Sequence, residues 1–511
     1  YNATISACEK GGEWELALWL LLHMQQASIQ PDVITHSAAI SACAKGQQWM
    51  VALDLLRREV VPDVIAFSAA ISACEKGQQW MVALELLRQV QAASLKPDVV
   101  GCSAAISACE KGRQWERALA LLWGMPRQGL APNATSFGAA ILACAASQRW
   151  QLALKLGDRM AARGVEMDSG SYSRLLSECE QHGLVSREVV LLRRLCWGGA
   201  RGGRSREHGA GGLGAAVTSV AAIRLMAACR DAEALQVLRE ASARGLWSAV
   251  MARLFATLDP AGLDRMPQGA EAKARRASLD FKGPASLAPP VSHAKELRLL
   301  EHVLTTACPG DPASVCAAVE RFGEVVLGSS SSWLKVAGGT KAEVLTKAVQ
   351  AAPPGGILEI GTYCGYSAIR MAMAVPKARI TTLEVDPVHM VIARNLIALA
   401  GLTHAVDVWT GHSQDLLPRL AARRGEPGLR VGAVFMDQRG SRYDEDLELL
   451  ERHGILLPGA VIVADNVLKP GAPIFLWRVL RGGGYRTRIV PVREFAMPAD
   501  DWLSVSVFEP G

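Results

Sequence analysis

A glycine-rich turn between residues 357 and 367 contains the residue types that point most directly to chemistry. The apolar segment Ile357-Leu-Glu-Ile leads into Gly361 and Gly365, which let the backbone pass close to a ligand before a helix begins. Glu384 ends the next apolar segment, at the distance where a carboxylate binds ribose hydroxyls. The pattern is not the dinucleotide GxGxxG. It indicates a pocket for a nucleoside cofactor such as S-adenosylmethionine, with a purely structural strand-to-helix turn as the alternative.

Oxygen-bearing side chains follow two further apolar segments. The segment from Val431 ends in Asp437, and the segment from Ala460 ends in Asp465 and Asn466. Three oxygen ligands with no His or Cys nearby suit Mg²⁺ or another hard divalent cation and argue against zinc. Because acids just after strands also cap helices, a structural role for them stays open.

The elements that would position these residues alternate between helix and strand after Lys295. We expect helices from Glu296, Ala313 and Thr340, and strands near Ile357, Ile380, Val406, Val431 and Val461. Such alternation builds a parallel sheet, and ligands of these sheets lie beyond the carboxyl ends of the strands, where the polar residues cluster. The predicted fold class of this half is α/β and Rossmann-like.

Several motifs in this half occur together. They are Lys295-Glu-Leu-Arg, Pro309-Gly-Asp-Pro, Leu358-Glu-Ile-Gly-Thr-Tyr-Cys-Gly-Tyr-Ser, Gly411-His-Ser-Gln-Asp, Ala464-Asp-Asn-Val-Leu-Lys-Pro-Gly-Ala-Pro and Arg493-Glu-Phe. With them, residues from about 295 to 511 resemble the catechol O-methyltransferase family along nearly their whole length. The resemblance implies Mg²⁺-dependent transfer of a methyl group from S-adenosylmethionine to a hydroxyl of a catechol-like small molecule, as in catecholamine metabolism.

The resemblance also implies a role for each matching residue. The cofactor would be bound by Ala337, Glu359, Gly361, Tyr363, Gly365, Tyr366, Ser367, Glu384, Ser413, Gln414 and Asp437. The Mg²⁺ ligands would be Asp437, Asp465 and Asn466. The substrate would contact Trp333, Asn466, Pro470 and Glu494, and Glu494 would accept a hydrogen bond from its second hydroxyl. Trp333 and Pro470 could equally be ordinary packing residues.

The chain departs from the family pattern at the substrate mouth. The family places a lysine that acts as general base three residues after the first metal acid, where this chain has Gly440. Arg439 replaces a tryptophan and Lys335 replaces a methionine, which makes the mouth more basic. Because Arg439 stays protonated near neutral pH, we predict that the hydroxyl proton passes to water or to Lys335. The predicted catalytic residues are therefore Glu494, Asp437 and Lys335. Turnover should be slow and rise with pH, and catechols bearing a carboxylate should be preferred.

Residues 1 to 198 contain a repeat. The motif Ile-Ser-Ala-Cys-Glu-Lys-Gly, followed by Trp and Ala-Leu and closed by Pro-Asp-Val, recurs from Ile5, Ile40, Ile71 and Ile106 and degenerately from Ile141. Spacings of 35, 31, 35 and 35 residues are typical of helical solenoids. Lys-Gly should end the first helix of each unit, and Pro-Asp should end the second. We predict an all-α helical-hairpin solenoid in which one tryptophan per unit packs between hairpins, namely Trp14, Trp49, Trp80, Trp115 and Trp150.

These units resemble pentatricopeptide repeats, with the unit that starts at Val33 four residues short. In that family a solenoid groove binds single-stranded RNA, and two side chains per repeat read one base. The implied reading pairs are Asn2 with Asp32, Ser37 with Asp63, Ser68 with Asp98, Ser103 with Asn133, and Gly138 with Asp168. By the family's code they would favour U, G, G, A and G. A protein-binding scaffold is the alternative, and an RNA-binding repeat protein with a degenerate, catalytically weak methyltransferase domain is the alternative for the whole chain.

Composition divides the chain into three predicted segments. A pentatricopeptide-like solenoid covers 1–198, a glycine- and proline-rich linker covers 199–292, and a catechol O-methyltransferase-like domain covers 293–511. Within the linker, residues 217–258 carry helical apolar spacing. We expect a helical pair there, which would either cap the solenoid or pack on the next domain.

Bulk composition limits the function classes. The 511 residues are too many for one core. Lys and Arg number 19 against 18 Asp and Glu over residues 1–200, and 23 against 23 from residue 293 onward, so a strongly basic groove for nucleic acid is not supported.

Cysteine usage and hydropathy bear on the compartment. Six cysteines recur once per repeat on the apolar face and are predicted to be small core residues, which favours a reducing compartment; they are Cys8, Cys43, Cys74, Cys109, Cys144 and Cys179. No apolar run reaches the roughly 18 residues of a membrane helix. We therefore expect a soluble intracellular protein, in the cytoplasm or an organelle, and expect from Tyr1 that the N-terminus is missing.

Overall fold

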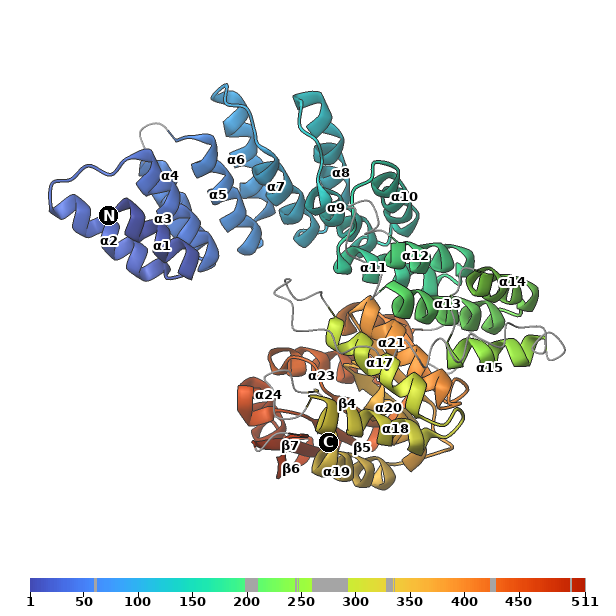
Figure 1. Cartoon of the computed structure of the whole chain (residues 1–511). Coiled ribbons are helices and arrows are strands. Elements are labelled where there is room, and N and C mark those ends of the chain that lie inside the picture. The colour runs from blue at the N-terminus through green and yellow to red at the C-terminus, as the bar shows by residue number, and fades with distance from the viewer. Residues whose placement is uncertain are drawn as a thin grey trace. The chain divides into compact units, whose positions relative to one another are not determined.

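The computed structural model describes residues 1–58, 62–197, 210–243, 246, 248–259, 293–327, 334, 336–422, 429–496 and 499–510. Two of the predicted site residues, Trp333 and Lys335, lie outside this set, as do both ends of the predicted linker. The chain forms two compact units, Tyr1–Glu178 and Cys179–Gly511 (Figure 1).

The first unit is a series of helical hairpins. Its helices are α1 (Asn2–Gly11), α2 (Trp14–Gln26), α3 (Val33–Lys45), α4 (Trp49–Arg58), α5 (Val64–Lys76), α6 (Trp80–Ala92), α7 (Val99–Lys111), α8 (Trp115–Gly124), the short η1 (Met125–Gln128), α9 (Ala134–Ala146) and α10 (Trp150–Ala162), while α11 (Ser169–Gln181) crosses the boundary between the units. The prediction of an all-α hairpin array is confirmed. The six repeated cysteines are buried, from Cys8 at 6% exposed to Cys43 at 0%, which confirms their place in the core.

Trp14, Trp49 and Trp80, which each begin a second helix, pack on the following hairpin, as predicted. A Cβ on Gly77 would lie 2.3 Å from Cδ1 of Trp49, and Gly46 and Gly112 stand in the same relation to Trp14 and Trp80. Lys-Gly does end the first helices, but the reason differs from a glycine in the left-handed conformation. Gly77 has φ −76°, and the left-handed residue is the next one, Gln78 with φ 58°. Glycine is needed because the indole occupies the space of a side chain.

The second unit begins with helices where the sequence analysis predicts the solenoid's end and part of the linker. They are α12 (Val185–Trp197), α13 (Ala210–Ala227), α14 (Asp231–Ala243) and α15 (Ala249–Leu258). Three helices lie in the region where we predict a pair, and the first of them, α13, begins earlier, in a segment rich in glycine and alanine. Its small residues allow a close approach to α21 (Pro387–Leu399), where Asn395 donates a hydrogen bond of 2.9 Å to the carbonyl of Ala216. These helices share one core, which includes Val189, Leu225, Leu238 and Phe255.

A seven-stranded sheet forms the centre of the second unit. Its strands are β1 (Gly356–Ile360), β2 (Ile380–Glu384), β3 (Val406–Thr410), β4 (Val431–Met436), β5 (Leu456–Ala464), β6 (Tyr485–Arg493) and β7 (Asp500–Phe508), in the order β3-β2-β1-β4-β5-β7-β6. The first five strands are parallel, as predicted, and β7 pairs antiparallel with both β5 and β6. The sequence analysis missed β6 and β7.

Further helices surround this sheet. They are α17 (Ala294–Thr306), α18 (Pro312–Arg321), α19 (Gly339–Ala351), α20 (Tyr366–Ala374), α22 (Ser413–Ala421), α23 (Tyr443–Arg452) and α24 (Pro473–Arg481), with the short η3 (Phe322–Leu327), η4 (Gly440–Arg442) and η5 (Val467–Gly471). Leu358, Val434 and Ile462 are fully or almost fully buried in the sheet, and Leu447 and Phe475 pack in the same core. Among the described helices, none combines the length and the apolarity that crossing a bilayer requires.

Candidate functional site

The turn after β1 brings the predicted cofactor residues to the ends of β1 and β2. Gly361 has φ 102°, and a Cβ there would lie 2.5 Å from the carbonyl oxygen of Asp437, so both conformation and space require glycine. Gly365, with φ 84°, precedes the first turn of α20 and lies against Ala393. Tyr363 donates its backbone N–H to Oε2 of Glu384 over 2.7 Å. The structure thus joins the glycine turn directly to the acid at the end of β2.

Two buried carboxyls flank this turn. Burial raises the pKa of Glu384 to about 7, against the hydrogen bonds donated by the backbone of Asp386 and Tyr363. Burial likewise raises the pKa of Glu359 to about 7, although Ser367 and Thr382 donate hydrogen bonds to it. A carboxylate in this position needs compensating donors, and the hydroxyls of a bound ribose would supply them to Glu384.

The other predicted cofactor residues come from several elements. Ala337 and Tyr366 are buried, and the hydroxyl of Tyr366 bonds to Glu320. Ser413 begins α22 and donates a hydrogen bond to Asp446, whose pKa burial raises to about 6. Gln414 is exposed and donates to Glu445 over 2.6 Å.

A buried lysine lies at the centre of the predicted metal site. Nζ of Lys341 is 2.9 Å from Oδ2 of Asp465 and 2.6 Å from Oδ2 of Asp501, and it also contacts Glu494. Asn466 donates through Nδ2 to Asp501 over 2.6 Å, which leaves its Oδ1 as the atom that can bind a cation. Asp437 directly follows β4 and interacts electrostatically with Asp465 and Lys341.

Negative charge exceeds positive charge in this cluster. Burial, followed by repulsion from Asp465, raises the pKa of Asp437 well above its usual value, and burial raises the pKa of Asp465 to about 6. Burial also raises the pKa of Glu494. Burial disfavours the charged form of Lys341, but the attraction of Asp465, Asp501 and Glu494 outweighs it and raises the pKa of the ammonium. Three carboxyls therefore contact one ammonium, and Asp437 is a fourth carboxyl that interacts with it electrostatically.

The donor set of this cluster fits a hard divalent cation. Oδ1 of Asp501 is buried and, within the described part of the chain, has no hydrogen-bond partner. A buried carboxylate oxygen without a partner is costly, and oxygen-only surroundings with excess negative charge suit Mg²⁺. Lys341 supplies only part of the positive charge that these acids require.

Gly440 has no room for a side chain. A Cβ there would lie 2.8 Å from the carbonyl oxygen of Gly471 and 3.2 Å from Cβ of Ala472. The close approach of η4 to η5 therefore excludes a lysine from this position without a backbone shift. Pro470 lies in η5 and is exposed, as is Arg439.

The acidic cluster consists of Asp437, Asp465, Glu494 and Asp501 around Lys341. Sequence reasoning missed two of these residues, Lys341 and Asp501. Lys341 lies on the same face of α19 as the buried Leu345 and Ala348, so a lysine on an apolar helix face was an available signal. Asp501 lies in the overlooked strand β7 and is 3% exposed. Polar residues in a strand that was not recognised gave no comparable signal.

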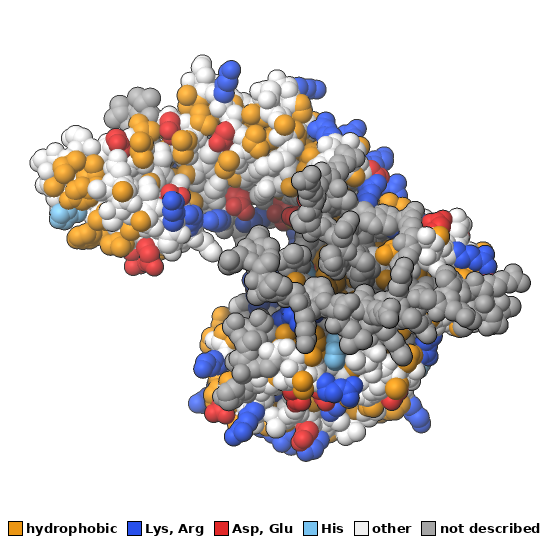
Figure 2. Space-filling model, viewed as in Figure 1, with side chains coloured by type: hydrophobic (Ala, Val, Ile, Leu, Met, Phe, Trp, Pro, Cys, Tyr) orange, Lys and Arg blue, Asp and Glu red, His pale blue; other side chains and the backbone are white. Residues whose placement is uncertain are grey.

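In the first unit, the structure brings together each predicted RNA-reading pair. Asn2 donates to Asp32 over 2.9 Å and Ser68 to Asp98 over 2.7 Å. Ser37 to Asp63 and Ser103 to Asn133 are both 3.4 Å, and a Cβ on Gly138 would lie 3.6 Å from Oδ2 of Asp168. The same acids also cap helices, since Asp98 accepts the N–H of Gly101 at the start of α7. Both basic and acidic side chains lie on the repeat helices on the face drawn in Figure 2.

Comparisons with known proteins match both halves of the chain. A family model described as O-methyltransferase matches residues 332–474. Models of the pentatricopeptide repeat domain and the PPR repeat match residues 85–146 and 1–29.

Two relatives and one solved structure illustrate the likeness. Catechol O-methyltransferase of Bos taurus is 40% identical over 183 residues, which are 36% of this chain and 65% of that protein. Catechol O-methyltransferase B of Danio rerio is 37% identical over 212 residues, 41% of this chain and 78% of that protein. An O-methyltransferase from Bacillus cereus, solved with SAH, is 22% identical, covers 47% of this chain and 97% of its own, and has a TM-score of 0.32. This chain thus spans 65% of the length of the bovine relative. Through its C-terminal half it belongs to the O-methyltransferase family of the catechol O-methyltransferases, and its N-terminal half is an array of pentatricopeptide repeats.

Proposed function

We propose that the second unit transfers a methyl group from S-adenosylmethionine to a hydroxyl of a catechol-like small molecule in an Mg²⁺-dependent reaction. The repeat array would be an appendage that binds RNA or protein. The observation that carries the enzymatic proposal is the excess of buried carboxyls around Lys341, at the same edge of the sheet as the glycine turn and Glu384.

Residues of the site would bind the cofactor, the metal ion and the substrate. Glu384 would accept hydrogen bonds from the ribose of the cofactor, whose sulfonium supplies an electrophilic methyl group. Asp437, Asp465 and Asn466 would hold Mg²⁺, which when bound lowers the pKa of a catechol hydroxyl and orients it. Lys341 fixes Asp465 and Glu494 in place. Glu494 would accept a hydrogen bond from the second hydroxyl.

The test is methylation of a simple catechol by the full chain with S-adenosylmethionine and Mg²⁺. We expect activity that a chelator removes and that Asp437→Ala reduces by at least about 100-fold, because a metal ligand is lost. The full chain is needed because α21 buries Asn395 against α13, which a fragment starting at residue 293 would lack. Activity that is equal with and without Mg²⁺, or in Asp437→Ala, would refute the metal assignment.

The pH dependence tests how the hydroxyl loses its proton. No lysine is present at residue 440, so the proton would pass to water or to Lys335. The rate at saturating Mg²⁺ should therefore rise between about pH 6.5 and 9, as the concentration of hydroxide and the neutral fraction of Lys335 increase. A flat profile over that range would contradict this account.

A second function is favoured by one observation, the lack of space at Gly440. If the missing base leaves the domain catalytically weak, the chain would act mainly as an RNA-binding repeat protein. By the pairs that the family's code implies, Asp98→Asn should change the preferred base at its position from G to A. Asn133 already caps α9 as Asp98 caps α7, so the fold should be kept. Binding of single-stranded oligonucleotides that differ at one base measures the change, and equal affinities for all of them would favour a protein-binding scaffold.

A further inference from the structure

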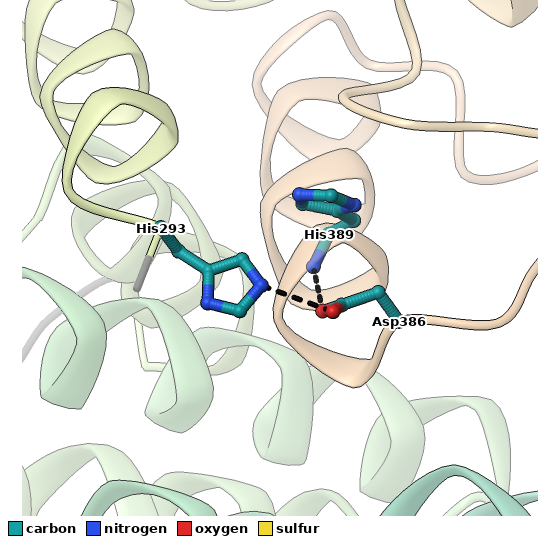
Figure 3. A group of neighbouring side chains, drawn as sticks. All are labelled: His293, Asp386 and His389. Carbon is teal, nitrogen blue, oxygen red and sulfur yellow. Dashed lines mark hydrogen bonds and ion pairs between the residues drawn. The ribbon is translucent and has the colours of Figure 1, made fainter. Parts of the chain in front are cut away.

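A second group of side chains, outside the acidic cluster, has residue types that could bind a metal ion. His293, Asp386 and His389 each offer one ligand atom, and these atoms lie within 4.8 Å of one another. Figure 3 shows that His293 comes from the start of α17, whereas Asp386 and His389 come from the start of α21. The two histidines are far apart in the sequence, so the fold itself brings them together.

The contacts leave one carboxylate oxygen of Asp386 next to a ring nitrogen of His293. Oδ1 of Asp386 accepts the N–H groups of Val388 and His389 over 2.8 and 3.2 Å and so caps α21. Oδ2 of the same carboxylate faces Nε2 of His293 at 3.0 Å. The two imidazole rings are 5.1 Å apart and nearly perpendicular. One carboxylate oxygen is thus committed to the helix, and the other contacts His293. One ligand atom from each of the three residues lies within 4.8 Å of the others.

The surroundings hold this group in place and leave it accessible. The ring of Tyr363 packs edge-on against His389 with centroids 4.9 Å apart, and the N–H of Asp386 donates to Glu384 over 2.8 Å. The side chains of His293 and Asp386 are both 21% exposed, and that of His389 is 22% exposed. An ion could therefore enter from solvent, and water could complete its coordination.

We propose that His293, Asp386 and His389 bind one divalent transition-metal ion of the zinc class. Two imidazole nitrogens and one carboxylate oxygen are the donor set that Zn²⁺, Co²⁺ and Ni²⁺ prefer, whereas Mg²⁺ and Ca²⁺ prefer oxygen alone. Because the ligands come from two helices, the ion ties the start of α17 to the start of α21. The ion would lie beside Tyr363 and Glu384, which are predicted to bind the cofactor.

Cobalt binding to the chelator-treated full chain, with Mg²⁺ in excess, tests the proposal. We expect one Co²⁺ per chain, with visible d–d absorption and no thiolate-to-cobalt band, since no cysteine belongs to the group. His293→Ala and His389→Ala should each weaken cobalt binding by at least about 100-fold. Loss of a residue that only hydrogen-bonds to a metal ligand already lowers metal affinity by about 10–100-fold. His404→Ala removes an exposed histidine from the same unit and should bind as the parent does.

Two further measurements separate binding from folding. Asp386→Asn can still cap α21, so a loss of cobalt affinity in this variant reflects the lost charge at the site. Zn²⁺ should raise the melting temperature of the parent and of His404→Ala, but not of His389→Ala. Equal cobalt affinity in the parent and His389→Ala overturns the proposal. So does a thiolate band, which would instead assign the ion to an exposed cysteine such as Cys229 or Cys308.

Discussion

Glu359 is a carboxyl whose burial makes stability depend on pH. It is 0% exposed in β1, and Thr382 donates a hydrogen bond of 2.5 Å to it. Burial raises its pKa from an ordinary 4.5 to about 7. Between these two values the folded chain binds more protons than the unfolded chain, so the free energy of unfolding should fall as pH rises from about 4.5 to about 7.

Replacing Glu359 by glutamine should remove part of this decrease in the free energy of unfolding. Above about pH 7 the variant should be more stable than the parent by up to about 3 kcal/mol, because no buried charge forms. Denaturant unfolding at a series of pH values measures this, with Glu343→Gln on the exposed face of α19 as the matched control. The free energy of unfolding should still depend on pH in both proteins, because burial also raises the pKa of Glu384 to about 7. A variant less stable than the parent at every pH would mean that the fold requires the ionised carboxylate.

For single residues, the sequence predicted which chemical groups lie at the site better than it predicted which side chains contact one another. Glu384, Asp465 and Asn466 follow apolar strands, and the parallel sheet places them at one edge as the sequence predicts. The role of Lys341 was not predicted, because a helix face shows that a side chain is buried but not which acids it meets. His293 and His389 had no signal at all, since only the packing of α17 against α21 joins them.

Among the helical hairpins, one glycine per repeat sets the distance between neighbours. A Cβ on Gly77 would lie 2.3 Å from Trp49, and the indole is held in the interface between hairpins. Cross-repeat polar contacts support the same spacing, since Lys111 pairs with Glu75 over 2.5 Å. The repeat is therefore specified by a tryptophan and a glycine that lie in consecutive units.

Gly77→Ala should destabilise the array by about 1–3 kcal/mol, because the methyl group overpacks the interface. Gly124→Ala is the control: Gly124 ends α8 in helical conformation, and a Cβ there meets nothing within 4 Å. That change should stabilise by about 0.4–1 kcal/mol, because alanine has less freedom than glycine in the unfolded chain. Thermal unfolding of the full chain followed by circular dichroism measures both variants. Equal changes in melting temperature for the two variants would show that the indole of Trp49 moves to accommodate the added methyl group.

The helical period made the repeats predictable, whereas the last two strands were not. Each hairpin repeats one pattern of apolar residues, so five units support one another in the sequence. β6 instead alternates exposed arginines with half-buried residues over Tyr485–Arg493, a period-two pattern that marks a strand covered on one face. The sequence therefore contained a pattern that predicts β6. The order of the elements did not predict that β7 and β6 extend the parallel sheet in antiparallel orientation.

Over the whole second unit, buried charges join the helical segment to the sheet. Glu180 accepts hydrogen bonds from the N–H of Thr410 over 2.9 Å and from Arg394 over 2.8 Å. Arg394 also lies 3.4 Å from Glu188, which is fully buried and paired with Arg224. These contacts fix the end of β3, directly before the segment that contains Ser413. Residues that composition assigns to repeat and linker thus stabilise the methyltransferase fold.

Arg394→Ala should cost about 3–5 kcal/mol of stability, because it leaves Glu180 and Glu188 buried with less compensation. Arg452→Ala, which removes an exposed arginine paired with Glu448, should have little effect. Denaturant unfolding measures the difference, and hydrogen exchange in α13 should quicken in Arg394→Ala alone. If the two variants unfold at the same denaturant concentration, the buried network contributes nothing to joining these elements.

The strand at one border of the sheet also affects how the protein behaves at high concentration. β6 ends the strand order, and its exposed residues include Arg486, Arg488, Pro491 and Arg493. A proline lacks the amide hydrogen that an incoming strand would need, and the positive charges of two such borders repel each other. Aggregation by strand-to-strand addition between molecules is therefore disfavoured at β6.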